Sequence, residues 1–207
     1  MLLFKQKLSI ILQTLMVIFV LGFCISIVYA YHYNGQKQLE TLESFEVQKP
    51  DFEHDNNQTF LDSVNKCVDY IYHTTSDIIP VNRELILAQA ALESGWGTSR
   101  FAREGKNLFG IRTYDLREPH MLPWKDKPKK WGVKVFFHEC DSVQNYIDIL
   151  NNGSAFEEYR KIKHEGENNP FVLIKTLGAY ASDENYFTKV KSIIVKIRSE
   201  YKLNYIK

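Results

Sequence analysis

The chain has 207 residues, with 26 basic and 25 acidic side chains and a formal net charge of +1. This length allows one ordinary domain with additional segments. The balanced charge provides no basic stripe to neutralise a phosphate backbone, so we expect no nucleic-acid partner. The sequence contains no nucleotide-binding glycine loop, CxxC pair or HExxH motif. We therefore expect neither a cofactor nor a metal site.

The N-terminal region carries a long uncharged segment. Leu8 to Ala30 contains no charged residue and follows Lys5 and Lys7. As a helix it spans about 35 Å, enough to cross a hydrocarbon core of about 30 Å, and it is longer than the apolar part of a signal peptide. We expect an uncleaved single-pass anchor at 8–30 in the cytoplasmic membrane, with residues 1–7 in the cytoplasm and the rest outside. A signal peptide cleaved after Val28-Tyr29-Ala30 is the alternative.

A polar stem is predicted to follow the anchor. Residues 31–58 are rich in acidic and polar side chains, and Pro50 interrupts any helix there. The remaining residues, 59–207, are predicted to form one domain. Within it, an extracytoplasmic location permits a disulfide between Cys67 and Cys140. Because sequence does not establish their distance, we interpret both as small buried hydrophobic residues.

The first predicted helix of the domain begins near Thr59, with Asp62 at the spacing of a capping box. Apolar residues recur at helical intervals along it and predict its inner face, which consists of Leu61, Val64, Val68 and Ile71.

The next helix is predicted to be buried. Asn82 can cap its start, and Leu85 to Leu92 is apolar or small at every position except Gln89. A helix of this composition has no polar face, so it belongs inside the domain. Gly95 is placed to end it in the left-handed conformation. A short helix capped by Thr98 or Ser99 and ended by Gly105 is expected to follow.

Glu93 lies in the last turn of this buried helix. The carbonyl groups at a helix end carry partial negative charge, and apolar surroundings disfavour an ionised carboxyl, so both effects raise the pKa of Glu93. A general acid that works near neutral pH needs such a raised pKa. The alternative is a structural ion pair with Arg83, Arg100 or Arg103.

Between Phe109 and Phe137 the helical periodicity gives way to short extended pieces separated by Pro and Gly. Val133 and Val135 alternate with the neighbouring Lys134, which is typical of a strand. We expect a small lobe of two or three strands. Its aromatic rings are suited either to stacking on sugars or to local packing, and they are Tyr114, Trp124 and Trp131.

The remainder is predicted to be helical. One helix starts at Asp141-Ser142 and stops at Gly153, and another follows a capping box of Ser154 and Glu157. Further helices are expected from Asn169-Pro170 to Gly178 and after Ser182, the last with an inward face of Val190, Ile193, Ile194, Ile197 and Tyr201. The predicted fold class is therefore α+β and mainly helical, with one small β lobe.

Two blocks resemble a known family. Ala88 to Ile111 contains Glu-Ser-Gly-Trp-Gly-x-Ser and Asn-Leu-Phe-Gly-Ile, and Tyr180-Ala181-Ser182-Asp183 lies near the end. Together they resemble the glucosaminidase domain of family 73 glycoside hydrolases, the Bax-type bacterial proteins in particular. The resemblance covers roughly residues 78–200 and implies a lysozyme-like fold. It also implies cleavage of peptidoglycan glycan strands at N-acetylglucosamine, without a cofactor, by a protein that we expect to be a monomer.

The resemblance also implies roles for individual residues. Glu93 corresponds to the general acid, and Tyr180 to a tyrosine across the cleft that assists at the reacting sugar. Glu184-Asn185 departs from the more usual Asp-Pro of that second block, which weakens the assignment of Asp183 to the site. The residues expected to bind substrate are Trp96, Asn107, Phe109, Tyr114 and Asp183.

A second catalytic carboxylate is left open. Glycoside hydrolysis normally uses two, and Asp115, Glu118 and Glu139 are candidates. The substrate's own 2-acetamido group is an alternative nucleophile. Two other functions also stay open, namely a lytic transglycosylase, which leaves anhydro ends, and a non-catalytic protein that binds glycan or acts as a scaffold.

Overall fold

The structure is a computed structural model that describes residues 16, 18–19, 21–34, 48–123, 130–180 and 183–203. It divides into two compact units, Met1–Glu46 and Val47–Lys207. In the first unit, residues 21–34 are helical. Among the described residues, none of the helices combines the length and apolar character needed to span a membrane. Much of the predicted anchor at 8–30 lies outside the described residues.

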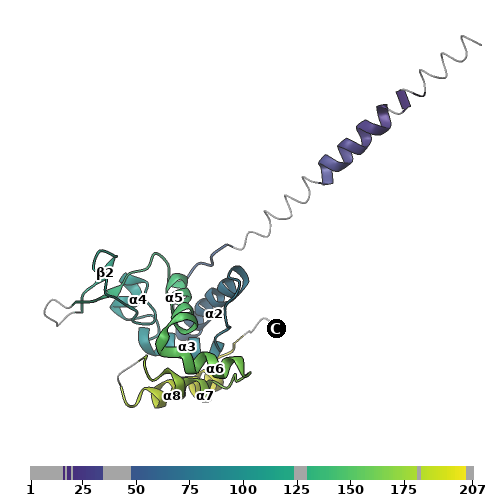
Figure 1. Ribbon diagram of the computed structural model, residues 1–207. Coiled ribbons are helices and arrows are strands. Elements are labelled where there is room, and N and C mark those ends of the chain that lie inside the picture. Colours follow the sequence, from purple (N-terminus) through teal and green to yellow (C-terminus); the bar gives the residue numbers. More distant parts are fainter. Residues whose placement is uncertain are drawn as a thin grey trace, which may run out of the picture. The chain divides into compact units, whose positions relative to one another are not determined.

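The second unit is a mainly helical α+β domain, which confirms the predicted fold class (Figure 1). Its described helices are α2 (Asn57–Thr74), α3 (Arg83–Ser94), α4 (Arg100–Gly105), α5 (Glu139–Asn152), α6 (Glu157–His164), α7 (Pro170–Leu173) and α8 (Tyr186–Glu200), with 3-10 turns η1 (Ser154–Phe156) and η2 (Ile174–Leu177).

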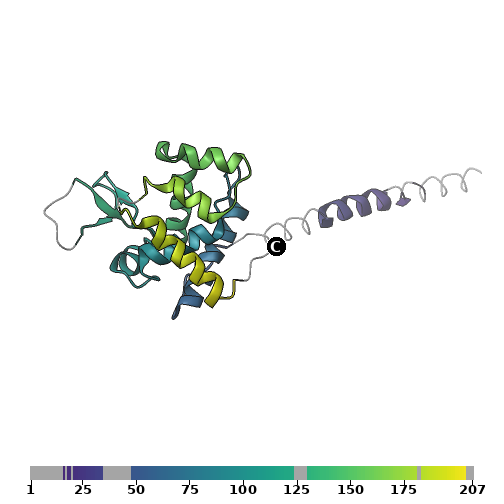
Figure 2. The same ribbon diagram turned by 90° about the horizontal axis from the view of Figure 1, so that it is seen from below.

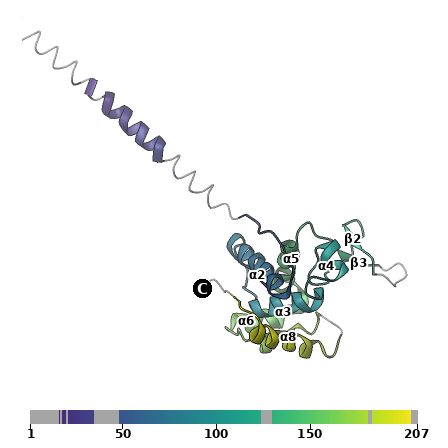
Figure 3. The same cartoon turned by 180° about the vertical axis from the view of Figure 1, so that it is seen from behind.

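Helix α3 lies in the middle of this domain. Figures 1 and 3 show α2 and α5 on one side of it and α8 on the other, and α8 packs along α3 more extensively than any other pair of elements does. Every residue from Leu85 to Ala91 is fully buried. The Asn82 side chain accepts a hydrogen bond from the Leu85 amide, and Gly95 ends the helix with a φ of 58°. The predicted buried helix and both of its ends are confirmed.

A three-stranded antiparallel sheet forms the small β lobe. Its strands are β1 (Arg112–Thr113), β2 (His120–Met121) and β3 (Gly132–Lys134), in the order β1-β3-β2. The sheet packs beside α4 at one end of the domain (Figures 1 and 2). The predicted lobe is therefore confirmed, although Trp124 lies outside the described residues.

Two predicted helix starts are wrong by two or three residues. Helix α2 is capped by Asn56, with Thr59 as its reciprocal partner three residues later. Helix α5 is capped by His138, whose partner is Asp141. In both cases the sequence reading took the inner member of the capping box for the cap itself. The reason is that the inner residues, Thr59 and Asp141, are themselves of types that commonly cap helices.

The later helices agree with the sequence in part. Asn169 caps α7 as predicted, by accepting a hydrogen bond from the Phe171 amide. The predicted capping box at Ser154 is absent, because residues from Ser154 form the turn η1, which has no side-chain cap. Ser182, the predicted cap of the last helix, lies outside the described residues, and α8 begins at Tyr186.

Residues 48–56, at the end of the predicted stem, are extended and pack against the domain. The rings of Phe52 and His54 make edge contacts with Phe60 of α2, at centroid distances of 6.1 and 5.3 Å. The Ser63 hydroxyl donates to the Glu53 carbonyl at 2.7 Å. This part of the stem therefore belongs to the second unit.

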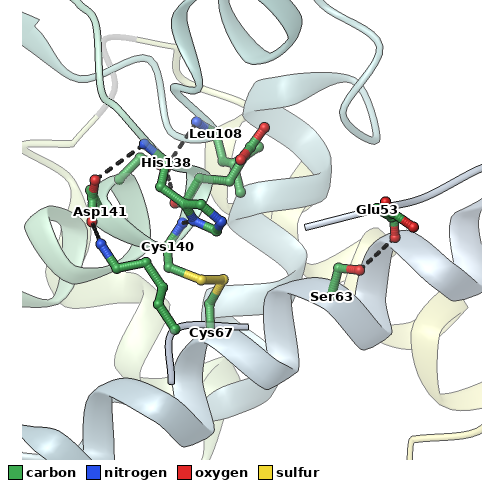
Figure 4. The surroundings of a disulfide bond; sticks show 10 residues. Glu53, Ser63, Cys67, Leu108, His138, Cys140 and Asp141 are labelled. Carbon is green, nitrogen blue, oxygen red and sulfur yellow. Dashed lines mark hydrogen bonds and ion pairs between the residues drawn. A yellow bond between two sulfur atoms is a disulfide. The ribbon is translucent and has the colours of Figure 1, made fainter. Parts of the chain in front are cut away.

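Cys67 and Cys140 form a disulfide, contrary to our interpretation of them as separate buried residues. Their Cα atoms are 5.0 Å apart, and the bond joins the middle of α2 to the first turn of α5, directly after the His138 cap (Figure 4). The packing of α2 on α5 brings the two residues together, and that packing is a tertiary feature that neither residue's local sequence encodes.

We expect removal of this disulfide to destabilise the domain strongly. Its two cysteines are 73 residues apart in sequence. Closing a loop of that length lowers the entropy of the unfolded chain, so replacing both cysteines by Ala should lower the free energy of unfolding by about 4 kcal/mol. Urea unfolding followed by tryptophan fluorescence measures the change. Cys24→Ala, which removes the free and exposed cysteine, is the matched control. A loss below about 1 kcal/mol would contradict the prediction.

Candidate functional site

Glu93 sits at the C-terminal end of α3, where the helix leaves the core. Its side chain is half-buried, and this burial raises its pKa, while a hydrogen bond from the Tyr186 hydroxyl acts in the opposite direction. Two of the arginines considered as ion-pair partners are engaged elsewhere. Arg83 pairs with Asp69 at 2.5 Å, and Arg100 pairs with Glu104. The expected environment of a reluctantly ionised acid is therefore present around Glu93.

The turn after Glu93 is held by Ser94 and two glycines. The buried Ser94 hydroxyl donates to the Ala90 carbonyl at 2.6 Å and accepts from the Gly97 amide at 2.8 Å. Gly97 has a φ of 79°, and a Cβ atom there would lie 2.3 Å from the His54 ring. Glycine is thus required at this position both by conformation and by space. The turn fixes where α3 stops and so where the Glu93 carboxyl lies.

Trp96 lies within this turn, with a φ of 59°. Its ring packs against Phe60 and Tyr201, with centroid distances of 6.3 and 5.6 Å, and the Lys196 ammonium lies 5.6 Å from the ring centroid. These contacts show that the Trp96 ring packs against the domain. Its predicted contact with a sugar stays a prediction.

Asn107 organises the loop that faces Glu93. Its side chain is 1% exposed and donates to the carbonyls of Ile111 and Lys134, at 2.9 and 2.8 Å. The same side chain accepts from the amides of Phe109 and Ile111. With its donors and acceptor all in use beneath the surface, Asn107 shapes the loop. Its buried side chain has no surface that a ligand could contact in this structure.

Gly110 brings that loop next to the catalytic candidate. Its φ is 64°, and a Cβ atom built on it would lie 3.9 Å from a carboxyl oxygen of Glu93. Backbone without a side chain therefore lies beside the carboxyl. The loop follows Phe109, which is 2% exposed and stacks on Tyr146 with a centroid distance of 4.3 Å.

Tyr180 joins the same cluster. Its hydroxyl donates to the Phe109 carbonyl at 2.8 Å, and its ring lies 5.6 Å from that of Tyr146 and 6.1 Å from that of Tyr186. Burial and then the charges of Tyr186 and Glu93 raise its pKa. The structure therefore brings Tyr180 and Glu93 together, as predicted from the two separate sequence blocks.

Two residues of this cluster were missed by the sequence analysis. Tyr186, the first residue of α8, hydrogen-bonds to Glu93, and Gln89 donates to the Tyr186 hydroxyl at 2.7 Å. A signal for Gln89 was present, because it is the single polar residue of an apolar helix and lies four residues before Glu93, on the same helix face. Tyr186 gave no comparable signal, since tyrosines are frequent in this chain.

The remaining predicted substrate residues lie at the surface. Tyr114, in the β lobe, is 73% exposed, which leaves its ring available for stacking. Asp183 precedes α8, pairs with Lys189 and accepts from the Asn185 amide at 2.9 Å. These bonds hold the pKa of Asp183 below its usual range and describe a local role at the helix start.

All three candidates for a second carboxylate have partners. Asp115 accepts two hydrogen bonds from the Arg117 guanidinium, and Glu118 accepts from the Thr113 hydroxyl at 2.9 Å. Glu139 pairs with Lys106 at 2.8 Å, and both line a cavity of about 330 Å³ whose lining does not include Glu93. The groups that the structure shows interacting with Glu93 are phenols. Within the described ranges, no cluster of His, Cys, Asp or Glu side chains is arranged to hold a metal ion.

Comparison with known proteins identifies the family of this chain. Residues 70–199 match the glucosaminidase family, described as mannosyl-glycoprotein endo-beta-N-acetylglucosaminidase. The match covers more than half of the chain, so this protein belongs to the glucosaminidase family of glycosidases. The predicted family is confirmed.

Several individual proteins are similar to it. Protein bax of Escherichia coli (strain K12) is 39% identical over 85 residues, which are 41% of this chain and 28% of bax. Exo-glucosaminidase LytG of Bacillus subtilis (strain 168) is 25% identical over 160 residues, which are 73% of this chain and 55% of LytG. The chain thus spans about half the length of LytG and less of bax.

Among solved structures, the glycoside hydrolase domain of Salmonella typhimurium FlgJ superposes with a TM-score of 0.51 and 25% identity, covering 70% of this chain and 90% of that domain. The catalytic domain of the autolysin Auto from Listeria monocytogenes gives a TM-score of 0.54 at 23% identity. The superposition covers 79% of this chain and 94% of that domain. The second likeness concerns the fold alone.

The raised pKa of Glu93 predicts a pH-dependent effect on stability. Burial raises the pKa of the folded state above the ordinary value of 4.5, so folding favours the protonated carboxyl. The contribution of this carboxyl to stability is complete below that ordinary value and is lost as the pH rises through the folded-state pKa. Relative to wild type, Glu93→Gln should therefore gain stability between about pH 4 and about pH 8. Urea unfolding at both pH values measures this, and a difference that shrinks with rising pH would contradict it.

Proposed function

We propose that this protein is a peptidoglycan hydrolase that cleaves the glycan strand as an endo-β-N-acetylglucosaminidase, with Glu93 as the general acid. The observation that carries the proposal is the half-buried Glu93 carboxyl at the end of a buried helix, with Gly110 and two tyrosines around it. Membership of the glucosaminidase family supports the reaction class. The substrate is supported by relatives such as the peptidoglycan hydrolase FlgJ of Vibrio parahaemolyticus, which is 29% identical over 133 residues.

In this reaction Glu93 protonates the glycosidic oxygen as the bond to the sugar breaks. A carboxyl with a raised pKa keeps its proton to higher pH than an ordinary glutamate does, which favours this step. Tyr180 interacts electrostatically with the same carboxyl, and its proposed role is to face the positive charge that develops on the sugar ring. Tyr114 and Trp96 are proposed to stack on neighbouring sugars, while Asn107 and Phe109 support the loop from below.

The test is digestion of isolated peptidoglycan by the full chain in detergent. Borohydride reduction of the products followed by hydrolysis identifies the new chain end. A glucosaminidase yields the reduced form of N-acetylglucosamine, a muramidase that of N-acetylmuramic acid, and a lytic transglycosylase leaves anhydro ends. We expect the first product, and release of fragments by Glu93→Gln should fall by about 100-fold or more, because general acid catalysis typically contributes that much.

Glu84→Gln is the matched control. Glu84 lies on the same helix but pairs with Arg198 at 2.6 Å in its first turn, away from Glu93. This variant should release fragments at the wild-type rate. Release of anhydro ends would move the protein to the transglycosylase class, and absence of products from wild type would leave only a non-catalytic role.

We also propose that residues 8–30 anchor the protein in the cytoplasmic membrane, with the catalytic domain outside. The uncharged length of this segment and the two preceding lysines support the anchor and its orientation. The Cys67–Cys140 disulfide supports an extracytoplasmic domain, because disulfides persist in oxidising compartments.

This location predicts that the full chain stays in the membrane pellet after alkaline carbonate extraction of cells. Replacing Leu21 and Ile25 by Arg should release it, because charges are costly in the middle of a bilayer. The mass of the purified wild-type chain is the second measurement. A protein that begins after Ala30 would overturn the anchor in favour of a cleaved signal peptide.

A further inference from the structure

Gln89 is an unusual residue for its position. It lies in the middle of α3, surrounded by the domain's apolar core, and its side chain is 0% exposed. Burial of an amide is unfavourable unless its donors and acceptor are hydrogen-bonded. An apolar side chain would pack equally well in the core at this position. The presence of an amide therefore indicates a role other than packing.

The amide joins two tyrosines from other helices. Its carbonyl oxygen accepts a hydrogen bond from the Tyr146 hydroxyl of α5. Its nitrogen donates to the Tyr186 hydroxyl of α8 at 2.7 Å. Tyr146 is 0% exposed and Tyr186 is 8% exposed, so this chain of hydrogen bonds is shielded from water. It ends at Glu93, with which the Tyr186 hydroxyl is also hydrogen-bonded.

The direction of each hydrogen bond follows from which end of the Gln89 amide faces which tyrosine. The Tyr146 hydroxyl gives its one proton to the amide oxygen, so the amide nitrogen faces Tyr186. An amide nitrogen only donates. The Tyr186 oxygen therefore accepts from Gln89, and its single proton is left for the carboxyl of Glu93.

We propose that Gln89 is a positioning residue for the glycosidase reaction, because it turns the Tyr186 proton toward one oxygen of the Glu93 carboxyl. The acidic proton is then carried on the other oxygen, from which it passes to the substrate. After the transfer, the same hydrogen bond stabilises the carboxylate. This inference rests on the proposed function, and it adds the residue that orients the acid.

The groups around Glu93 are few enough to make the proposal testable. Tyr186 faces it from α8, Tyr180 faces it from the segment before α8, and the Gly110 backbone lies opposite. Both tyrosines are neutral, since burial raises the pKa of each. Loss of the bond from Tyr186 therefore raises the pKa of Glu93, because that bond favours the charged carboxyl.

The first experiment compares Gln89→Met with wild type and with Gln144→Met, in full chains in detergent. Gln144 lies on α5 and bonds to Asp148 at 2.8 Å, so this control makes the same chemical change outside the cluster. For Gln89→Met we expect kcat to fall about tenfold, KM to change less than about twofold, and the basic limb of the pH profile to move upward by about half a unit or more. A purely structural role would lower activity with the folded fraction and leave the pH profile unchanged.

Tyr146→Phe is a gentler second variant. It keeps the ring in the core and removes only the proton that locks the amide, so the nitrogen no longer has to face Tyr186. The pH profile should shift in the same direction as in Gln89→Met, by a smaller amount. If this variant folds and its profile equals that of wild type, the proposal is overturned.

A carbon NMR titration of the Glu93 carboxyl separates this proposal from the proposed function. The pKa of Glu93 should rise most in Tyr186→Phe, which removes the hydrogen bond to the carboxyl, and less in Gln89→Met, which frees the Tyr186 hydroxyl to rotate. The double variant should add little to the effect of Tyr186→Phe. Unchanged pKa values overturn the inference even where wild type digests peptidoglycan. If the pKa of Glu93 rises in the variants but wild type digests no peptidoglycan, the orienting role of Gln89 is supported and the proposed glycosidase reaction is refuted.

Discussion

The burial of α3 is the constraint on which the rest of this domain depends. The helix is enclosed by α2 and α5 on one side and α8 on the other, and it delivers Glu93 where the core ends. Segments from different parts of the chain provide the surroundings of that carboxyl. Helix α8 supplies Tyr186, and the loop after α4 supplies Gly110. A site assembled in this way depends on the whole core for its geometry.

The loop opposite Glu93 shows how a buried polar residue can build a surface. Asn107 uses its donors and its acceptor to close the turn through Ile111 and to tie it to β3. Phe109 then stacks on Tyr146, which itself bonds to Gln89 in α3. The loop and α3 are therefore connected through one aromatic cluster.

Local sequence was enough to predict the buried helix, its ends at Asn82 and Gly95, and the position of Glu93, because these features depend on neighbours within one or two turns. The link from Gln89 to Tyr186 joins residues 97 positions apart and depends on how α8 packs, which no local pattern encodes. The same holds for the disulfide, whose cysteines are 73 residues apart. The inward position of the Asn107 side chain was likewise not readable from local sequence, since a hydrogen bond across 27 residues holds it there.

The hydroxyl of Tyr180 has a single hydrogen, and the Phe109 carbonyl takes it. With that hydrogen committed, the phenol offers its other neighbours only oxygen lone pairs and the electron-rich face of its ring. Such a surface favours an electron-poor neighbour or a hydrogen-bond donor, and it offers no proton to an oxygen atom that needs one. The backbone carbonyl of the facing loop thereby sets the polarity that this aromatic residue presents to its surroundings.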